Sequence, residues 1–172
     1  MEQGLVHLYT GDGKGKTTAG IGLAVRAKGA GKRVLFLQFM KGMATSETTP
    51  LKSLGIEVVR KESSPKFVFA MTPEEKASYR QEQQDCFRYA KEHCMDFDLI
   101  VFDEAVSAIS EGMIDEDDFI AFLGSRPFSL EVAITGRKPS RRLLDCADYC
   151  SEILMISHPY ERGIGARLGI EY

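Results

Sequence analysis

The sequence predicts an α/β protein in which a mainly parallel central sheet is flanked by helices. Short apolar runs alternate with segments of helical periodicity along the chain, which is typical of strand–helix–strand units. Residues 98–103 are apolar throughout the middle of the run, as expected for a strand that helices cover on both faces. The length of 172 residues suits one ordinary domain, and no repeat or linker divides it. We therefore expect residues 1–172 to form a single domain.

In its first half the chain is expected to form three strands and two helices. The strands are expected at residues 5–10, 33–39 and 55–60, and the first helix at residues 17–28. The second helix has an explicit start, because Thr72, Pro73 and Glu75 form a capping box with proline at the first helical position. Its apolar positions recur at helical spacing and predict one buried face, made of Cys86, Phe87, Ala90 and Cys94.

The second half continues the alternation. Strands are expected at residues 98–103, 130–135 and 153–156, and a helix at residues 141–147. Asp115 is a good N-cap for another helix. The apolar positions of that helix are Phe119, Ile120, Phe122 and Leu123.

Composition and charge exclude several classes of protein. An apolar fraction of 44% and a charged fraction of 27% exclude disorder along the whole chain. A formal net charge of -3 argues against a broad nucleic-acid footprint and against a polybasic membrane patch. No apolar run reaches the ~20 residues of a membrane-spanning helix. Residues 1–8 lack the pattern of a secretory signal, so we expect a cytoplasmic protein.

The four cysteines are too few for a disulfide scaffold and stand at Cys86, Cys94, Cys146 and Cys150. Cys146 and Cys150 are four positions apart and can share a helix face. A zinc site would need two more ligands, and the histidines of the chain are His7, His93 and His158. Buried free thiols are therefore the favoured interpretation.

A glycine- and lysine-rich loop is the strongest single signal. The segment GDGKGKTT lies between the first expected strand and the first expected helix, which is the context of a phosphate-binding loop. Glycines let backbone N–H groups turn toward phosphate oxygens, and the helix directs the positive end of its dipole at the same place. Lys16 can neutralise phosphate charge, and Thr17 can offer a hydroxyl to Mg²⁺.

We therefore expect a P-loop NTPase-like fold in which the whole loop binds ATP phosphates through Gly11, Asp12, Gly13, Lys14, Gly15, Lys16, Thr17 and Thr18. The usual motif has its first glycine where this chain has Thr10, so the loop that starts at Gly11 is one residue tighter. A chance glycine turn is the alternative interpretation.

Two further strand ends support an ATP–Mg²⁺ site. Asp103 and Glu104 follow a buried strand and can hold Mg²⁺ directly or through water, although either can instead cap the next helix. Arg137 follows the next strand, where a triphosphate would need a cation, although a solvated loop arginine is the alternative. The carboxyl ends of parallel strands meet at one edge of the sheet, and ligands bind there.

The chain as a whole resembles the P-loop type of ATP:corrinoid adenosyltransferases, the enzymes that make adenosylcobalamin. The resemblance rests on LVHLYTGDGKGKTTAG, on LQFMKG with Gln38, Lys41 and Gly42, and on VFDE, AITGR and HPYERGIGARLGIEY, in that order. It implies that Co(I) of a reduced corrinoid attacks the ribose 5′ carbon of ATP and that triphosphate leaves. Since cobalt is the nucleophile, the protein positions the substrates and neutralises charge.

The resemblance also assigns residues. It implies that Lys16, Arg137 and Glu104 carry the catalytic contacts, and that Thr17 and Glu104 hold Mg²⁺. Asp103 is added to the expected Mg²⁺ ligands from its place at the strand end. It further implies that the triphosphate lies reversed in the loop relative to ordinary ATPases, which fits the tighter loop.

On the corrinoid side the family typically has Phe-x-Trp, whose aromatic rings help displace the lower axial ligand of cobalt. The matching stretch here is Phe67-Val68-Phe69, and the chain has no tryptophan. Two core phenylalanines are the alternative interpretation. Many members have an N-terminal arm over the corrinoid, whereas only residues 1–4 precede the first expected strand. The cover over the corrinoid is therefore expected to be absent or built otherwise. We do not expect His158 to be a cobalt ligand.

The resemblance implies a homodimer and a reductase that supplies electrons to form Co(I). Two other functions remain open from the residues. One is a P-loop ATPase or phosphotransferase that attacks the γ-phosphate of ATP. The other is a sensor that binds ATP or a corrinoid without turnover.

Overall fold

A computed structural model describes residues 2–42, 45–61, 66 and 68–172 of the protein. Strands of the described residues form a six-stranded sheet in the order β3-β2-β4-β5-β1-β6, and every neighbouring pair is parallel. This confirms the predicted α/β class with a parallel sheet. The strands are β1 (Val6–Thr10), β2 (Val34–Gln38), β3 (Glu57–Arg60), β4 (Leu99–Asp103), β5 (Glu131–Thr135) and β6 (Tyr149–Glu152).

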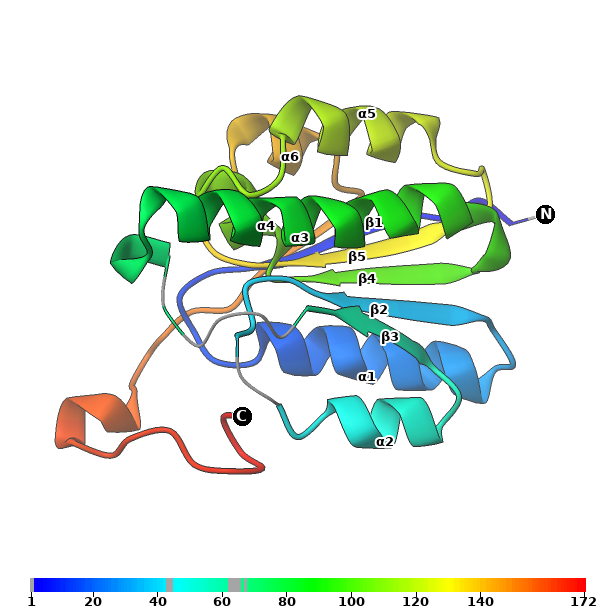
Figure 1. The fold of residues 1–172 in the computed structure, drawn as a ribbon. Coiled ribbons are helices and arrows are strands. Elements are labelled where there is room, and N and C mark those ends of the chain that lie inside the picture. Colours follow the sequence, from blue (N-terminus) through cyan, green and yellow to red (C-terminus); the bar gives the residue numbers. More distant parts are fainter. Residues whose placement is uncertain (1, 43–44, 62–65, 67) are drawn as a thin grey trace.

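Helices cover both faces of the sheet (Figure 1). Helices α1 and α2 lie on one face, and α3, α4, α5 and α6 lie on the other. Their bounds are α1 (Lys16–Gly29), α2 (Thr48–Ser53), α3 (Pro73–His93), α4 (Ala105–Ser110), α5 (Glu116–Ser125) and α6 (Arg141–Asp145). Short 3₁₀ helices are η1 (Val68–Ala70), η2 (Cys94–Asp96) and η3 (Pro159–Arg162). None of the helices in the described residues has the length and apolar character needed to cross a bilayer.

The core consists of two layers, one on each face of the sheet. Strand β2 alternates between them, since Leu35 and Leu37 pack under α3–α6 whereas Val34 and Phe36 pack against α1 and α2. Strand β4 is buried along its whole length, as its apolar run predicts. The layer under α3–α6 is rich in aromatic rings, among which Phe102 packs edge-on against Phe87, Phe119 and Phe122.

The capping signals in the sequence fix two helix starts as predicted. The Thr72 hydroxyl accepts from the Glu75 backbone N–H, and the Glu75 carboxylate accepts from the Thr72 N–H. The Asp115 carboxylate accepts from the Asp118 N–H and begins α5. The short helices α2 and α4 were not predicted, because six residues are too few to show a helical period.

The last strand is not where the sequence predicts it. Residues 153–156 are not a strand, and the strand beside β1 is instead β6. Because β6 is an edge strand whose four side chains are all exposed, its sequence needs no apolar alternation. The apolar run that suggested a strand follows β6 and passes beside the glycine-rich loop, where the Gly13 N–H donates to the Ile153 carbonyl.

The cysteines also differ from the expectation. Only Cys86 is a buried thiol, where burial raises its pKa to about 11, and Cys150 is exposed. Cys146 and Cys150 do not share a helix, since Cys146 follows α6 and Cys150 lies in β6. In the described part of the chain, no three His, Cys, Asp or Glu side chains are grouped to hold a metal ion.

Two glycine-to-alanine variants should have opposite effects on stability, because one glycine is crowded and the other has open space around it. Gly22 lies within α1 with open space at its Cβ position, so Gly22→Ala should stabilise the protein by about 0.5–1 kcal/mol through helix propensity. A Cβ on Gly13 would lie 2.6 Å from the Leu154 carbonyl oxygen, so Gly13→Ala should lower the melting temperature. Thermal unfolding of both variants checks this, and an unchanged melting temperature for Gly13→Ala would contradict the close approach.

Candidate active site

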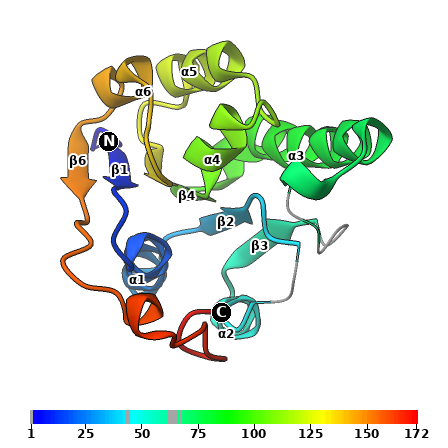
Figure 2. The ribbon, with the colours of Figure 1, turned by 90° about the vertical axis from the view of Figure 1, so that its left-hand side faces the viewer.

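A cavity of about 1080 Å³ opens at the carboxyl edge of the sheet. The view onto that edge in Figure 2 shows β1 leading into α1 and the segment after β6 running past α1 toward α2. The cavity is lined by the glycine-rich loop, by the connection between β2 and α2, by the residues after β4 and β5, and by the C-terminal segment. This is the edge at which the sequence predicts ligand binding.

The glycine-rich loop is shaped by a close backbone neighbour. The Ile153 N–H donates to the Thr10 carbonyl, and the Gly13 N–H donates to the Ile153 carbonyl. Gly11 has a φ of 100° and no room for a side chain, since a Cβ would lie 2.4 Å from the Ile153 carbonyl oxygen. Residues 12–18 line the cavity, whereas Gly11 lies behind it against Ile153.

Lys16 lies at the floor of the loop with 7% of its surface exposed. Its Nζ donates to the Gly13 carbonyl at 2.7 Å. Burial lowers the pKa of Lys16, and the nearby Arg137 guanidinium lowers it further. A polyanion in the cavity would offset both effects, so this lysine is suited to hold phosphate.

Asp103 is buried beneath the loop with none of its surface exposed. Its Oδ1 accepts hydrogen bonds of 2.8 Å from the hydroxyls of Thr17 and Thr135. Burial raises the pKa of this carboxyl, and the two hydroxyl donors partly oppose that change. Asp103 does not line the cavity, but Thr17, whose hydroxyl it holds, does.

Glu104 reaches the cavity through an unusual backbone conformation. Its φ of 59° is left-handed, and its N–H donates to the Thr135 hydroxyl at 2.9 Å. The carboxylate lines the cavity and accepts from the Ser107 hydroxyl at 2.7 Å. Glu104 occupies the N-cap position of α4, but its side chain makes no capping bond to the backbone.

Arg137 lines the cavity beside the glycine-rich loop. Its Nη1 is 4.0 Å from Asp12 Oδ1, and its side chain is 61% exposed. Gly136 before it has a φ of 145°, and a Cβ there would lie 2.6 Å from Val106 Cβ. Arg137 is therefore solvated and also directed at the cavity. From the sequence these were alternatives, a solvated loop arginine and a cation for a triphosphate.

The residues present fit a magnesium ion. The Thr17 hydroxyl and the Glu104 carboxylate are hard oxygen groups at the cavity wall, and Mg²⁺ prefers such ligands. Mg²⁺ usually keeps several waters and binds substrate phosphates together with one or two protein groups. Two protein oxygens beside the glycine-rich loop match that pattern.

A polar network beside the cavity was not assigned from the sequence. Gln38 is buried at the end of β2, where its Oε1 accepts from Arg60 at 3.0 Å and from Thr45 at 3.2 Å. Its Nε2 donates to Glu47 at 2.5 Å. These contacts join β2 and β3 to the connection that lines the cavity. Gln38 stands at the carboxyl end of a buried strand, and this position is the sequence feature that would assign it to the cavity edge.

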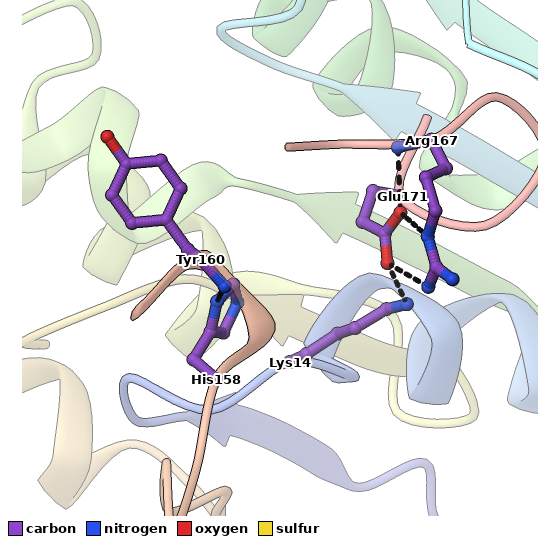
Figure 3. Close-up of polar contacts among 5 residues, drawn as sticks. All are labelled: Lys14, His158, Tyr160, Arg167 and Glu171. Carbon is purple, nitrogen blue, oxygen red and sulfur yellow. Dashed lines mark hydrogen bonds and ion pairs between the residues drawn. The ribbon is translucent and has the colours of Figure 1, made fainter. Parts of the chain in front are cut away.

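The aromatic residues expected on the corrinoid side are only partly described. Phe67 lies outside the described residues. Phe69 lies in η1 and is 84% exposed, so the alternative of a core phenylalanine is wrong for this residue. His158 lines the cavity, and its Nδ1 accepts from the Tyr160 N–H at 3.2 Å, which fixes the start of η3 (Figure 3).

Comparison with known proteins agrees with the motifs. The family model described as "ATP:corrinoid adenosyltransferase BtuR/CobO/CobP" matches residues 2–172. A corrinoid adenosyltransferase of Escherichia coli K12 is 32% identical over 174 residues, which cover 99% of this chain and 87% of the relative. The corrinoid adenosyltransferase CobA of Salmonella typhimurium gives the same identity and coverage. A corrinoid adenosyltransferase of Pseudomonas aeruginosa is 29% identical over 99% of this chain and 85% of the relative.

Removing the charge of Asp103 should stabilise the protein. Asp103→Asn keeps an oxygen that accepts from Thr17 and Thr135 but removes the cost of ionising a buried carboxyl. Well below pH 4 the wild-type carboxyl is protonated in both the folded and the unfolded protein. Above that pH it ionises freely in the unfolded protein, whereas burial opposes its ionisation in the folded protein. The melting temperature of Asp103→Asn should therefore exceed that of the wild type by a margin that grows as the pH rises above 4. A variant that melts below the wild type at pH 7 would show that the carboxylate stabilises the fold.

Proposed function

The chain belongs to the ATP:corrinoid adenosyltransferase family, and on that premise we propose that it transfers the 5′-deoxyadenosyl group of ATP to Co(I) of a reduced corrinoid. The bond from cobalt to the 5′ carbon forms as the bond from that carbon to the triphosphate oxygen breaks. Triphosphate leaves with the electron pair, and the reaction serves adenosylcobalamin synthesis. The observation that carries the proposal is the ordered match of residues 2–172 to the family, together with a phosphate-binding loop at the cavity.

The leaving triphosphate determines what the protein must do. Its negative charge increases at the bridging oxygen as the bond to the 5′ carbon breaks, so cations close to the phosphates lower the barrier. We assign this role to Lys16 and Arg137, and we assign the backbone of residues 12–18 to the phosphate oxygens. The corrinoid supplies the nucleophile, so the protein acts through positioning and charge.

We also propose that MgATP is the form bound. Thr17 and Glu104 would hold the ion against the triphosphate, where Mg²⁺ supplies a further positive charge. Asp103 would act through Thr17, because its Oδ1 holds that hydroxyl from below the loop. Lys14 belongs to the same loop, but its Nζ is paired with Glu171.

The remaining proposals concern the surroundings of the reaction. A reductase would supply the electron that converts Co(II) to Co(I), and the cytoplasm would provide the reducing conditions. A homodimer is supported by the exposed edge strand β6 and by the exposed apolar side chains that follow it, Leu154, Met155 and Ile156. We propose that residues 1–172 act as one domain, because one sheet includes strands from both halves of the chain.

Product analysis tests the proposed reaction. Wild-type protein with MgATP and chemically reduced cobalamin should consume the Co(I) absorbance and release triphosphate. Lys16→Ala should reduce the rate by at least about 100-fold, because it removes a charged contact to the leaving group. Lys76→Ala, on an exposed position of α3, is the matched control and should react at the wild-type rate. Release of ADP or phosphate would indicate phosphoryl transfer, and the absence of any product would indicate a sensor.

Phe69→Ala tests the corrinoid side. A bulky apolar ring against the lower face of the corrinoid can take the place of the lower axial ligand and so make Co(I) accessible. The variant should therefore lose most activity when the corrinoid has a lower ligand and the reductant is weak. It should lose little when Co(I) is supplied ready made or the corrinoid lacks that ligand.

Phe128→Ala is the matched control, since Phe128 is also exposed but precedes β5 at the opposite edge of the sheet. Turnover of both variants is measured with both corrinoids under both reducing conditions. Equal losses for Phe69→Ala in all four conditions would contradict a role at the lower face.

A further inference from the structure

The segment after η3 closes one side of the nucleotide cavity although it packs little against the core. Every residue from 161 to 170 is exposed. Nevertheless Ala166, Gly169, Ile170, Glu171 and Tyr172 all line the cavity that contains the glycine-rich loop. Figure 2 shows this segment beside the start of α1 and in front of α2. Its position is therefore fixed by polar contacts at the cavity.

Glu171 is the centre of those contacts (Figure 3). Its Oε1 accepts from Lys14 Nζ at 2.9 Å and from Arg167 Nη2 at 3.0 Å. Its Oε2 accepts from the Arg167 backbone N–H at 2.8 Å and from Nε at 3.1 Å. These bonds hold the pKa of Glu171 well below its usual range. A carboxylate has about four acceptor sites, so Glu171 has no acceptor capacity left for a ligand and serves to anchor the segment.

A second anchor lies on the other side of the cavity. The Ser46 hydroxyl donates to the Tyr172 carbonyl at 2.9 Å, and the Gly169 N–H donates to the same oxygen at 2.7 Å. The segment thus spans from the glycine-rich loop, through Lys14, to the connection between β2 and α2, through Ser46. Two apolar side chains are held between these anchors at the cavity, Ile170 with 57% and Tyr172 with 42% of its surface exposed.

The size of the cavity indicates which part of a ligand Ile170 and Tyr172 contact. Pockets for whole drug-sized ligands measure about 300–1000 Å³, and this cavity of about 1080 Å³ exceeds the needs of a triphosphate alone. When the phosphates occupy the glycine-rich loop, the nucleoside must lie against the remaining walls. The apolar groups on those walls include Ile21 of α1, Pro50 of α2 and Ile170 of the C-terminal segment.

We propose that Ala166 and residues 169–172 form the nucleoside-binding wall of the ATP site, with Ile170 and Tyr172 against the adenosine and Glu171 as the positioning residue. This inference rests on the proposed function, because it takes ATP as the ligand. The wall determines where the adenosine lies relative to the loop, and hence how the 5′ carbon is presented to the corrinoid. Lys14 anchors this wall through its contact with Glu171.

The affinities of two ligands distinguish a nucleoside-binding role of the C-terminal segment from the other roles considered below. The affinities of MgATP and of magnesium tripolyphosphate, which has no nucleoside, are measured by calorimetry at fixed ionic strength without corrinoid. Ile170→Ala should weaken MgATP binding by about five- to tenfold, as expected for truncation of a partly buried aliphatic side chain, and leave tripolyphosphate unchanged. A variant that ends at Leu168 should show a larger loss for MgATP alone, and Glu171→Gln an intermediate one.

Matched controls come from the same part of the chain. Leu168→Ala removes an aliphatic side chain that is 74% exposed and does not line the cavity. Glu161→Gln removes an exposed carboxylate in η3. Both controls should bind MgATP and tripolyphosphate as the wild type does. Thermal unfolding should give the same melting temperature for all five variants within about 2 °C, since the segment adds little to the core.

Three results would overturn the proposal. Equal weakening of both ligands would mean that the segment only shapes the loop through Lys14. Tighter binding of tripolyphosphate to the shortened variant would mean that Glu171 competes with phosphate for that lysine. Unchanged binding of both ligands would remove the segment from the site. A wild-type protein that binds neither ligand would instead contradict the proposed function, and the nucleoside wall with it.

Discussion

The buried carboxylate of Asp103 is the contact on which the site depends. It ends β4 and accepts hydroxyl bonds from Thr17 at the start of α1 and from Thr135 at the end of β5. Thr135 in turn accepts from the backbone of Glu104 and holds it in a left-handed conformation. One acceptor thus fixes the first turn of α1, the end of β5 and the direction of Glu104. An uncompensated carboxylate is costly in such a place, and the two hydroxyls make it tolerable.

Overall charge and local charge differ in this protein. The chain has a formal net charge of -3, which argues against partners that bind broad basic surfaces. The cavity nevertheless gathers the cations Lys14, Lys16, Lys41, Lys66 and Arg137 along its wall. Acidic side chains lie among them, and Glu171 is paired with Lys14, so part of this positive charge is offset within the cavity. The net charge therefore excludes the wrong partners without revealing where a triphosphate would bind.

The sequence predicted the parts of the fold whose signals are local. The buried run of β4, the capping box at Thr72 and the cap at Asp115 each specify an element by its own residues. It placed the last strand wrongly because β6 is held by backbone pairing to β1 with every side chain exposed. No residue pattern marks such a strand. The apolar run after it contacts the glycine-rich loop through the Ile153 backbone, while Leu154, Met155 and Ile156 stay exposed.

The residues of the candidate site were predictable where they follow a strand end, and not where a contact distant in sequence places them. Residues 12–18, Glu104 and Arg137 follow strand ends and meet at one edge, as parallel topology requires. The C-terminal segment has no such signal, because what brings it to the cavity is the pairing of Glu171 with a lysine 157 positions away. Gly11 and Asp103 were also predicted as site residues. Their places in the loop and at the strand end follow from the sequence, but their position behind the cavity wall does not.

The place of β1 in the sheet has a consequence for the order in which the protein folds. β1 lies between β5 and β6, so both of its neighbours are made long after it during synthesis. Until residues 131–153 have left the ribosome, the first strand lacks its two neighbours, and the glycine-rich loop lacks the backbone of Ile153 that supports it. Contacts this distant in sequence slow folding. The glycine-rich loop, although among the first residues made, is therefore among the last to acquire its native shape, and the proposed ATP site forms only after most of the chain has been made.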